Sequence, residues 1–306
     1  MNRREFFSLT LPLSLAFVSE ANDSSTTEPL LRFGVIADPQ YKDAKPAGTR
    51  YYKNSLAKLE VAIAHLNQEK LAFVVTLGDL IDADFSSFAP VMKQYAALAA
   101  PHFPILGNHD FSVTDDEKSK VLTALGMEKP YYSRILNGWR FLFLDGTDIG
   151  TWRYPANDDR TAAAIKMREE LLKNKAPQAA EWNAGIGKEQ LRWIDEELTA
   201  AAIAKQPAIL FCHYPICPLA HELNLWNDQE VSALLQKHPH ALAWMNGHNH
   251  EGNYGKLGHV HCLNFKGMVE TENQTAYATV ACYEDRLVIQ GYGLEPKRDL
   301  KKSAAS

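Results

Sequence analysis

The sequence predicts an α/β fold in which strands form a layered sandwich covered by helices. Short apolar strands alternate with helices over most of the chain, and the segments after residue 258 resemble strands joined by short turns. Polar residues gather directly after the strands. Helix-covered strands followed by antiparallel strands are typical of such layers. The length of 306 residues allows a single large domain, and we expect one over residues 31–296.

The first elements follow from their hydrophobic patterns. Apolar runs with β-branched and aromatic residues, each ending at a polar or glycine-containing segment, predict buried strands. Between the first two, apolar residues recur at helical spacing from Tyr52 to Leu66, which predicts an amphipathic helix. The predicted strands are Leu31–Ala37, Phe73–Leu77, Phe103–Leu106 and Trp139–Leu144.

The second half continues the alternation and then changes character. Lys188–Ala200 has the spacing of a helix, and Ala208–Cys212 and Ala241–Asn246 are expected strands. His259–Phe265, Tyr277–Tyr283 and Arg286–Tyr292 predict a meander that closes a second sheet, and residues 297–306 form an expected polar tail. Two loop-rich segments, 151–188 and 217–228, contain Trp152, Trp182 and Trp226 and are candidates to cap a site.

The composition excludes several classes of protein. Lys and Arg number 32 against 37 Asp and Glu, for a net charge of −5, which disfavours a polynucleotide partner. The four cysteines have no zinc-finger spacing. We expect them to be buried as small apolar residues, with Cys262 and Cys282 as the pair to test for a disulfide. The oligomeric state is left open by these patterns.

The N-terminus has the pattern of an export signal. Arg3 and Arg4 precede a short apolar run and a small-residue cleavage site, so residues 1–21 resemble a twin-arginine signal peptide, read by the twin-arginine export machinery. Residues 22–30 are an expected flexible linker. The apolar run is too short to span a membrane, and no stable membrane anchor is expected. A periplasmic or secreted location follows; the alternative is a basic N-terminus on a cytoplasmic protein.

Five separated segments place polar side chains just beyond predicted strand ends. In open α/β sheets, ligands bind at that rim. Mixed nitrogen and oxygen donors without cysteine suit divalent transition ions such as Mn, Fe, Co or Zn. Taken singly, each residue could instead belong to a turn or to a hydrogen-bonded core. The candidate donors are Asp38, Gln40, Asp79, Asn108, His213, His248 and His250.

In their order along the chain, these motifs resemble the calcineurin-like metallophosphoesterase superfamily. The resemblance runs from about residue 31 to 292 and implies a four-layer αββα sandwich with mixed sheets and a two-metal centre. Most members have histidine at the position of Gln40. A glutamine there resembles the subgroup of Mn-dependent ADP-ribose/CDP-alcohol diphosphatases. The segments similar to that subgroup are 38–41, 50–52, 78–82, 188–193 and 267–271.

The resemblance implies a role for each donor. Asp79 would bridge two divalent ions, for which we expect Mn, with Fe, Co, Zn or Mg as alternatives. Next to Asn108, His109 would protonate the leaving oxygen, and Asp110 is a candidate to orient its imidazole. The first ion would also be bound by Asp38, Gln40 and His250, and the second by Asn108, His213 and His248.

The implied activity is hydrolysis of the phosphoanhydride bond of nucleoside diphosphate derivatives, such as ADP-ribose or CDP-alcohols, by a metal-bridging hydroxide. Tyr41, Arg50 and Tyr51 could hold a second phosphate and a base, or could be ordinary packed and surface residues. Within the superfamily, a cyclic-nucleotide or general phosphodiesterase and a phosphomonoesterase are the alternatives. A metal- or nucleotide-binding protein without turnover is a third.

Overall fold

The computed structural model describes residues 28–219 and 221–302. The signal peptide expected over residues 1–21, and residues 22–27 of the expected linker, lie outside the described residues. Among the helices of the described ranges, none is both long enough and apolar enough to cross a membrane.

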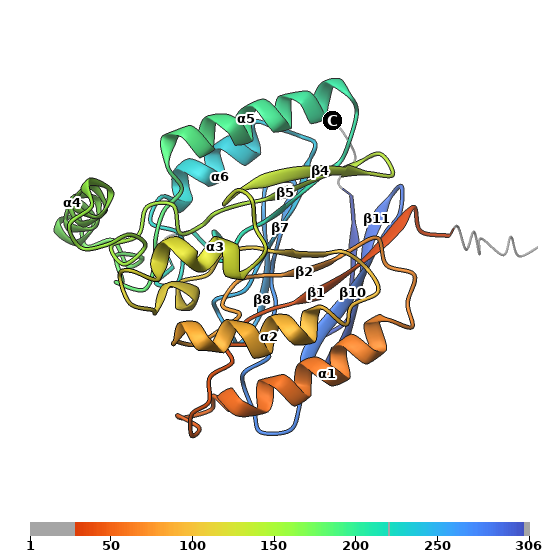
Figure 1. The fold of residues 1–306 in the computed structure, drawn as a ribbon. Coiled ribbons are helices and arrows are strands. Elements are labelled where there is room, and N and C mark those ends of the chain that lie inside the picture. Colours follow the sequence, from red (N-terminus) through yellow and green to blue (C-terminus); the bar gives the residue numbers. More distant parts are fainter. Residues whose placement is uncertain (1–27, 220, 303–306) are drawn as a thin grey trace, which may run out of the picture.

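Two six-stranded mixed sheets form the centre of the molecule (Figure 1). The first has the order β12-β11-β10-β1-β2-β3, and the second β4-β5-β6-β7-β9-β8. The strands of the first sheet are β1 (Leu31–Ile36), β2 (Val74–Thr76), β3 (His102–Pro104), β10 (Ala276–Cys282), β11 (Arg286–Gly293) and β12 (Arg298–Lys301). Those of the second are β4 (Tyr132–Leu136), β5 (Trp139–Phe143), β6 (Ala208–Phe211), β7 (Ala241–Asn246), β8 (Asn253–Leu257) and β9 (Val260–Asn264).

Helices cover the outer faces of both sheets. Figure 1 shows α1 and α2 on the side of the first sheet, and α5 and α6 on the side of the second. The arrangement confirms the predicted four-layer αββα sandwich in one domain. The helices are α1 (Ser55–Leu66), α2 (Phe88–Tyr95), α3 (Val121–Ala124), α4 (Asp159–Lys173), α5 (Lys188–Ile203) and α6 (Asp228–Gln236).

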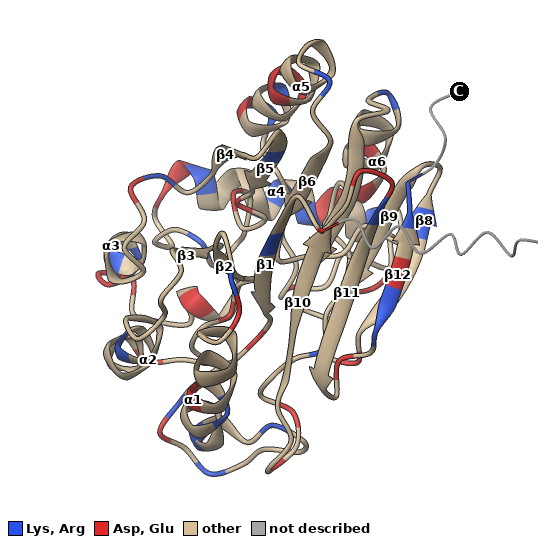
Figure 2. Ribbon diagram, turned by 90° about the vertical axis from the view of Figure 1, so that its right-hand side faces the viewer, with Lys and Arg blue, Asp and Glu red and all other residues tan. Residues whose placement is uncertain are grey.

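Three apolar cores hold the four layers together. Between the sheets lies an aromatic cluster in which Phe33 stacks on Phe73 with ring centroids 4.9 Å apart. A second core joins the outer face of the second sheet to α5 and α6, and a third joins the first sheet to α1 and α2. Burial of this apolar surface is the main term that stabilises the sandwich. Figure 2 shows the charged residues mainly on helices and loops, and β10 carries none.

The C-terminal strands correct the predicted meander. The expected strand at 259–265 is β9 and lies in the second sheet, whereas β10 and β11 extend the first sheet through antiparallel pairing of β10 with β1. Arg298–Lys301, expected as polar tail, pairs with β11 as the edge strand β12. The strand has only four residues, and of these only Leu300 is buried. Its sequence therefore lacks the alternation of apolar and polar residues by which a strand is predicted.

The segment 151–188, predicted to be loop-rich, contains the helix α4. Its N-cap, Asp158, accepts a hydrogen bond from the backbone N–H of Arg160. Only Thr161 and Ala164 are buried in its length, and Figure 1 shows α4 standing apart from the sandwich. A helix that buries so little lacks the apolar stripe from which an amphipathic helix is recognised. Of the three tryptophans in the segments proposed to cap a site, Trp226 is buried.

Parallel pairing determines where the polar segments meet. β1, β2 and β3 run parallel in the first sheet, and β5, β6 and β7 run parallel in the second. Carboxyl ends of parallel strands lie at the same edge of a sheet. The segments after β1, β2, β3, β6 and β7 therefore converge at one rim of the sandwich.

Candidate metal centre

Three donor atoms, on the segments that follow three separate strands, form the centre of the site. Nε2 of His213 lies 3.3 Å from Oδ2 of Asp79 and 3.2 Å from Nδ1 of His248. The three ligand atoms all lie within 4.8 Å of one another, so together they could hold a metal ion. Oδ1 of Asn108 lies 3.1 Å from the same His213 nitrogen.

A second group of donors lies on the other side of Asp79. Nε2 of Gln40 donates to Oδ2 of Asp79 at 3.0 Å and lies 3.1 Å from Nε2 of His250. That nitrogen of His250 is 3.4 Å from Oδ1 of Asp38. All seven predicted donors are thus brought together, with Asp79 in contact with both groups.

The second ring nitrogen of each histidine has its own partner. His213 donates from Nδ1 to the carbonyl oxygen of Leu77 at 2.7 Å, and His250 donates from Nδ1 to Oε1 of Glu270 at 2.7 Å. His248 donates from Nε2 to Oδ1 of Asn183 at 3.0 Å, because the amide nitrogen of Asn183 is used on backbone carbonyls. In the neutral form of each imidazole, the proton stays on this outer nitrogen, and the nitrogen that faces the cluster has a lone pair that can bind a cation.

The backbone bends sharply at the strand ends to aim these side chains. Asp38, Gln40, Asp79 and His248 all have positive φ angles, between 41° and 67°. Such a conformation costs on the order of 1 kcal/mol or more per non-glycine residue. Its clustering at four candidate donors indicates that the fold holds strained residues where a site needs them.

Glycine makes the close packing at the rim possible. A Cβ atom at position 107 would lie 2.2 Å from Oδ1 of Asp79, and one at position 247 would lie 2.3 Å from Oδ2 of Asp38. Real atoms do not approach so closely, so any side chain at Gly107 or Gly247 would displace a candidate donor.

His109 is oriented by Asp82, not by Asp110 as expected. Nδ1 of His109 donates to the carbonyl oxygen of Asp82 at 3.0 Å and lies 3.3 Å from its carboxylate. Burial alone would lower the pKa of His109, but the negative charges of Asp79 and Asp82 outweigh it and raise that pKa to about 9.

Asp110 instead organises the backbone beneath the site. Its buried carboxylate accepts hydrogen bonds from the N–H groups of Gly107 and Leu80 at 2.9 and 2.8 Å, and from that of Asp79 at 3.1 Å. Burial raises the pKa of this carboxyl to about 7. The prediction that it orients the imidazole is wrong because its oxygens point at these loops.

The groups of the cluster differ in the direction in which their pKa values are shifted. Burial opposes ionisation of Asp79, yet the neighbouring His213 and His109 hold its pKa well below the ordinary value. Burial likewise opposes a charge on His213, but Asp79 raises the pKa of His213 to about 9. Burial and the adjacent His213 depress the pKa of His248, which stays neutral. The site therefore offers both a carboxylate and a neutral imidazole to a cation.

The expected substrate residues lie at the margin of the site. Nε of Arg50 is 3.9 Å from Oε1 of Glu270, the residue that orients His250. The side chain of Arg50 is 37% exposed, so part of it remains accessible to a ligand. Tyr51, the next residue in the chain, and Tyr41 are both half-buried.

Sequence reasoning gave no role to Asp82, Asn183 or Glu270, each of which holds a histidine of the site. Asp82 and Glu270 lie inside the segments 78–82 and 267–271, whose likeness to a known subgroup was the available signal. Asn183 belongs to a loop after α4, and nothing in its sequence pattern marks it.

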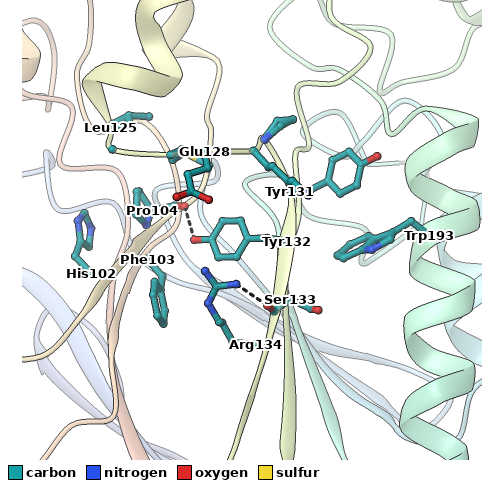
Figure 3. Close-up of a pocket in the computed structure, with 14 residues that line it drawn as sticks. His102, Phe103, Pro104, Leu125, Glu128, Tyr131, Tyr132, Ser133, Arg134 and Trp193 are labelled. Atoms are coloured by element: carbon teal, nitrogen blue, oxygen red, sulfur yellow. Dashed lines mark hydrogen bonds between the residues drawn. The ribbon is translucent and has the colours of Figure 1, made fainter.

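A separate cleft of 790 Å³ opens between the edge strands β3 and β4 (Figure 3). Its walls combine polar and aromatic side chains, the latter including Tyr131, Tyr132 and Trp193. The hydroxyl of Tyr132 donates to the carbonyl oxygen of Pro104. None of the candidate donors lines this cleft.

The donor set fits a divalent metal. Oε1 of Gln40 is buried and has no hydrogen-bond partner among the described residues, and a buried carbonyl oxygen without a partner is costly unless something binds it. Carboxylate, amide and imidazole groups together suit a transition ion of intermediate hardness.

A two-sheet sandwich with such a donor cluster at its rim defines the metallophosphoesterase class of hydrolases. The calcineurin-like phosphoesterase family matches residues 31–252. The chain therefore belongs to this family.

Curated relatives cover nearly the whole chain. A protein of Xenopus laevis, named manganese-dependent ADP-ribose/CDP-alcohol diphosphatase, is 30% identical over 89% of this chain and 91% of its own length. The human protein of the same name is 29% identical, with 90% and 94% covered. Among solved structures, a dimetal phosphatase from Danio rerio has a TM-score of 0.81 at 24% identity and covers 90% of this chain and 100% of its own, which shows the shared fold.

Proposed function

We propose that the protein hydrolyses the phosphoanhydride bond of nucleoside diphosphate derivatives, such as ADP-ribose or CDP-alcohols, with manganese as its metal. The single observation that carries the proposal is the convergence of Asp79, His213 and His248 at the rim. The names of the full-length relatives support the substrate class and the metal.

Two sets of residues would hold the metals, with Asp79 shared between them. Asp38, Gln40 and His250 complete one set, and Asn108, His213 and His248 complete the other. When bound, a pair of divalent ions supplies Lewis-acid activation of water and neutralises charge on the phosphoryl group. The chain contributes fixed imidazoles, whose outer nitrogens are bound to Leu77, Asn183 and Glu270.

His109 would deliver a proton to the leaving oxygen. Its Nδ1 is engaged by the carbonyl oxygen of Asp82, which leaves Nε2 free to carry and donate a proton. The backbone N–H of His109 also donates to Oδ1 of Asp79 at 2.8 Å. The same residue therefore orients the shared carboxylate and presents an acid beside it.

A substrate panel tests the proposal. ADP-ribose, CDP-choline, a 2′,3′-cyclic nucleotide and a phosphomonoester are each offered with Mn, Mg, Zn and Co in turn. We expect the two diphosphates to be cleaved fastest, with Mn most effective. Cleavage of the monoester alone would contradict the diphosphatase activity, and preference for the cyclic nucleotide would favour the phosphodiesterase alternative.

The variant Asp79→Asn tests whether the two sets of donors share this carboxylate. We expect no turnover and weakened metal binding, because the shared carboxylate is lost. Full activity of this variant would contradict the shared-ligand arrangement. Metal binding by the unchanged protein with no turnover of any substrate would support the alternative of a non-catalytic binding protein.

We also propose that the chain is exported by the twin-arginine route to the periplasm or beyond. Support comes from the Arg3-Arg4 pair before a short apolar run. Arg3→Lys with Arg4→Lys should stop export of the full chain while leaving its activity in lysates unchanged. Continued export would contradict the proposal.

A further inference from the structure

Two cysteines lie against each other, on segments far apart in the chain. Cys217 follows the His213 segment and is partly exposed, whereas Cys262 lies on β9 and is buried. Cys217 packs against the core that contains Cys262. Cys262 also lowers the pKa of the Cys217 thiol, which indicates that the two side chains interact. This pairing differs from the expected pair of Cys262 and Cys282.

Cys282 cannot reach Cys262 in this fold. It lies on β10 of the first sheet and faces the core between the sheets. Cys262 lies in the second sheet and faces the core under α5 and α6. A layer of β-sheet therefore separates the two thiols.

Gly255 creates the space that brings Cys217 to Cys262. Gly255 is the register partner of Cys262 across the β8–β9 ladder, so the two positions share one face of the sheet. A Cβ atom on Gly255 would lie 2.7 Å from Sγ of Cys217. The φ angle of Gly255 is not positive, so the backbone does not demand glycine there. What the missing side chain provides is room for the Cys217 sulfur.

We propose that Cys217 and Cys262 form a disulfide bond that ties the segment following His213 to β9. The cross-link would enclose residues 218–261, which include His248 and His250. It would therefore hold the chain on both sides of the candidate metal centre, independently of which substrate the site takes.

The bond would form by thiol–disulfide exchange, with an external disulfide as the two-electron oxidant. The Cys217 thiolate attacks one sulfur of the external disulfide, so that a mixed disulfide forms and one thiolate leaves. The Cys262 thiolate then attacks the Cys217 sulfur, and the second thiolate leaves. The protein loses two electrons and its two thiol protons, and the external disulfide becomes two thiols.

The environment of the pair suits this order of attack. Cys217 is the accessible member, and the hydrogen bond from Cys262 lowers the pKa of Cys217 to about 7. The same contact, together with burial, raises the pKa of Cys262. Cys217 is thus the thiol that would ionise first and react with an external oxidant.

Oxidised glutathione is the probe for the experiment. The purified full chain is oxidised and mapped by mass spectrometry without reduction. We expect loss of two hydrogens and a peptide pair linked through Cys217 and Cys262. Oxidation should raise the Tm by roughly 5 °C, since the closed loop restricts the unfolded chain. A Cys217 found only as its glutathione adduct, or a link to another cysteine, would overturn the proposal.

Three variants make the result specific. Cys217→Ser should abolish both the link and the redox-dependent rise in Tm. Cys282→Ala should change neither, because Cys282 lies in another core. Gly255→Ala should slow formation of the link severalfold, since its methyl group would occupy the place of the Cys217 sulfur. An unchanged rate in Gly255→Ala would contradict the steric argument, and a Tm rise that persists in Cys217→Ser would exclude this disulfide as its cause.

Discussion

Glu270 holds His250 through a hydrogen bond of 2.7 Å between Oε1 and Nδ1. Its loop is bound to the strand end that carries Asp38, because the N–H of Val269 donates to the carbonyl oxygen of Asp38 at 3.0 Å. One carboxylate on a C-terminal loop therefore sets the ring orientation of a candidate donor that follows β7. Partners of this kind tune metal affinity although they do not touch the metal.

Removing that carboxylate should weaken metal binding. For Glu270→Ala we expect Mn affinity, measured by calorimetry, to fall about 10- to 100-fold. Glu270→Gln should lose less, because its amide oxygen can still accept from Nδ1. Exposed Glu272 provides the control, and Glu272→Gln should bind Mn normally. Equal affinities in all three variants would show that Glu270 does not position His250.

The proton on His109 should matter most for poor leaving groups. Loss of a general acid costs roughly 100-fold or more, and an alkoxide needs the proton more than a phosphate does. His109→Ala should therefore impair hydrolysis of an alkyl phosphodiester more than that of a diphosphate, as measured by kcat. Equal losses on both substrates would contradict the role of His109 as an acid.

Asp82→Asn should reproduce part of this effect. The carbonyl oxygen of Asp82 still accepts from Nδ1 in this variant, but the nearby negative charge is lost. We expect a smaller fall in kcat than for His109→Ala, with Mn affinity unchanged. Asp84→Asn, a change at a more exposed carboxylate, is the matched control. A fall as large in the control would point to a general effect of surface charge.

Two glycines should separate site geometry from stability. Gly107→Ala places a methyl group against Asp79 and should greatly weaken Mn binding. Gly126→Ala meets no neighbouring atom but has a φ of 69°, so it should cost about 1 kcal/mol of stability and leave Mn binding intact. Thermal unfolding and calorimetry on both variants check this contrast. Normal Mn affinity in Gly107→Ala would show that Asp79 can shift without loss.

Lys58 is expected to be a structural support of the Glu270 loop. Its ammonium group donates to the carbonyl oxygens of residues 268–271, at 2.6 to 3.2 Å. Lys58→Met would leave several of these acceptors unpaired and should lower the free energy of unfolding by at least about 2 kcal/mol. Urea unfolding of the metal-free protein measures the loss. Lys70→Met, at an exposed position, should change stability little, and a similar loss there would contradict the expectation.

The positions of these strands along the chain, and the polar residues that follow them, could be predicted from the local hydrophobic pattern. Phe73–Leu77 followed by Asp79, and Ala208–Cys212 followed by His213, each show an apolar run that stops at a donor. Such runs need a buried environment on both faces, and parallel strands then bring their carboxyl ends to one rim. That is why seven donors scattered between residues 38 and 250 could be expected together.

Other features depended on partners that the pattern does not reveal. The helix α4 carries no apolar stripe because it buries only two residues. Asp110 was assigned to its sequence neighbour, His109, but the fold turns its carboxylate toward the backbone of residues 79–80 and 107. Cys262 and Cys282 were the pair to test for a disulfide, whereas sheet topology places the two in different cores.

The sequence by itself determined the class of fold and the chemical identity of the donors, because hydrophobic periodicity and residue type are local properties. Tertiary structure alone decided which groups hold those donors and His109 in place. Asp82, Asn183 and Glu270 reach their histidines only after the strands pair and the loops close over the rim. Hydrogen bonds between residues far apart in the chain depend on that packing, which no short stretch of sequence encodes.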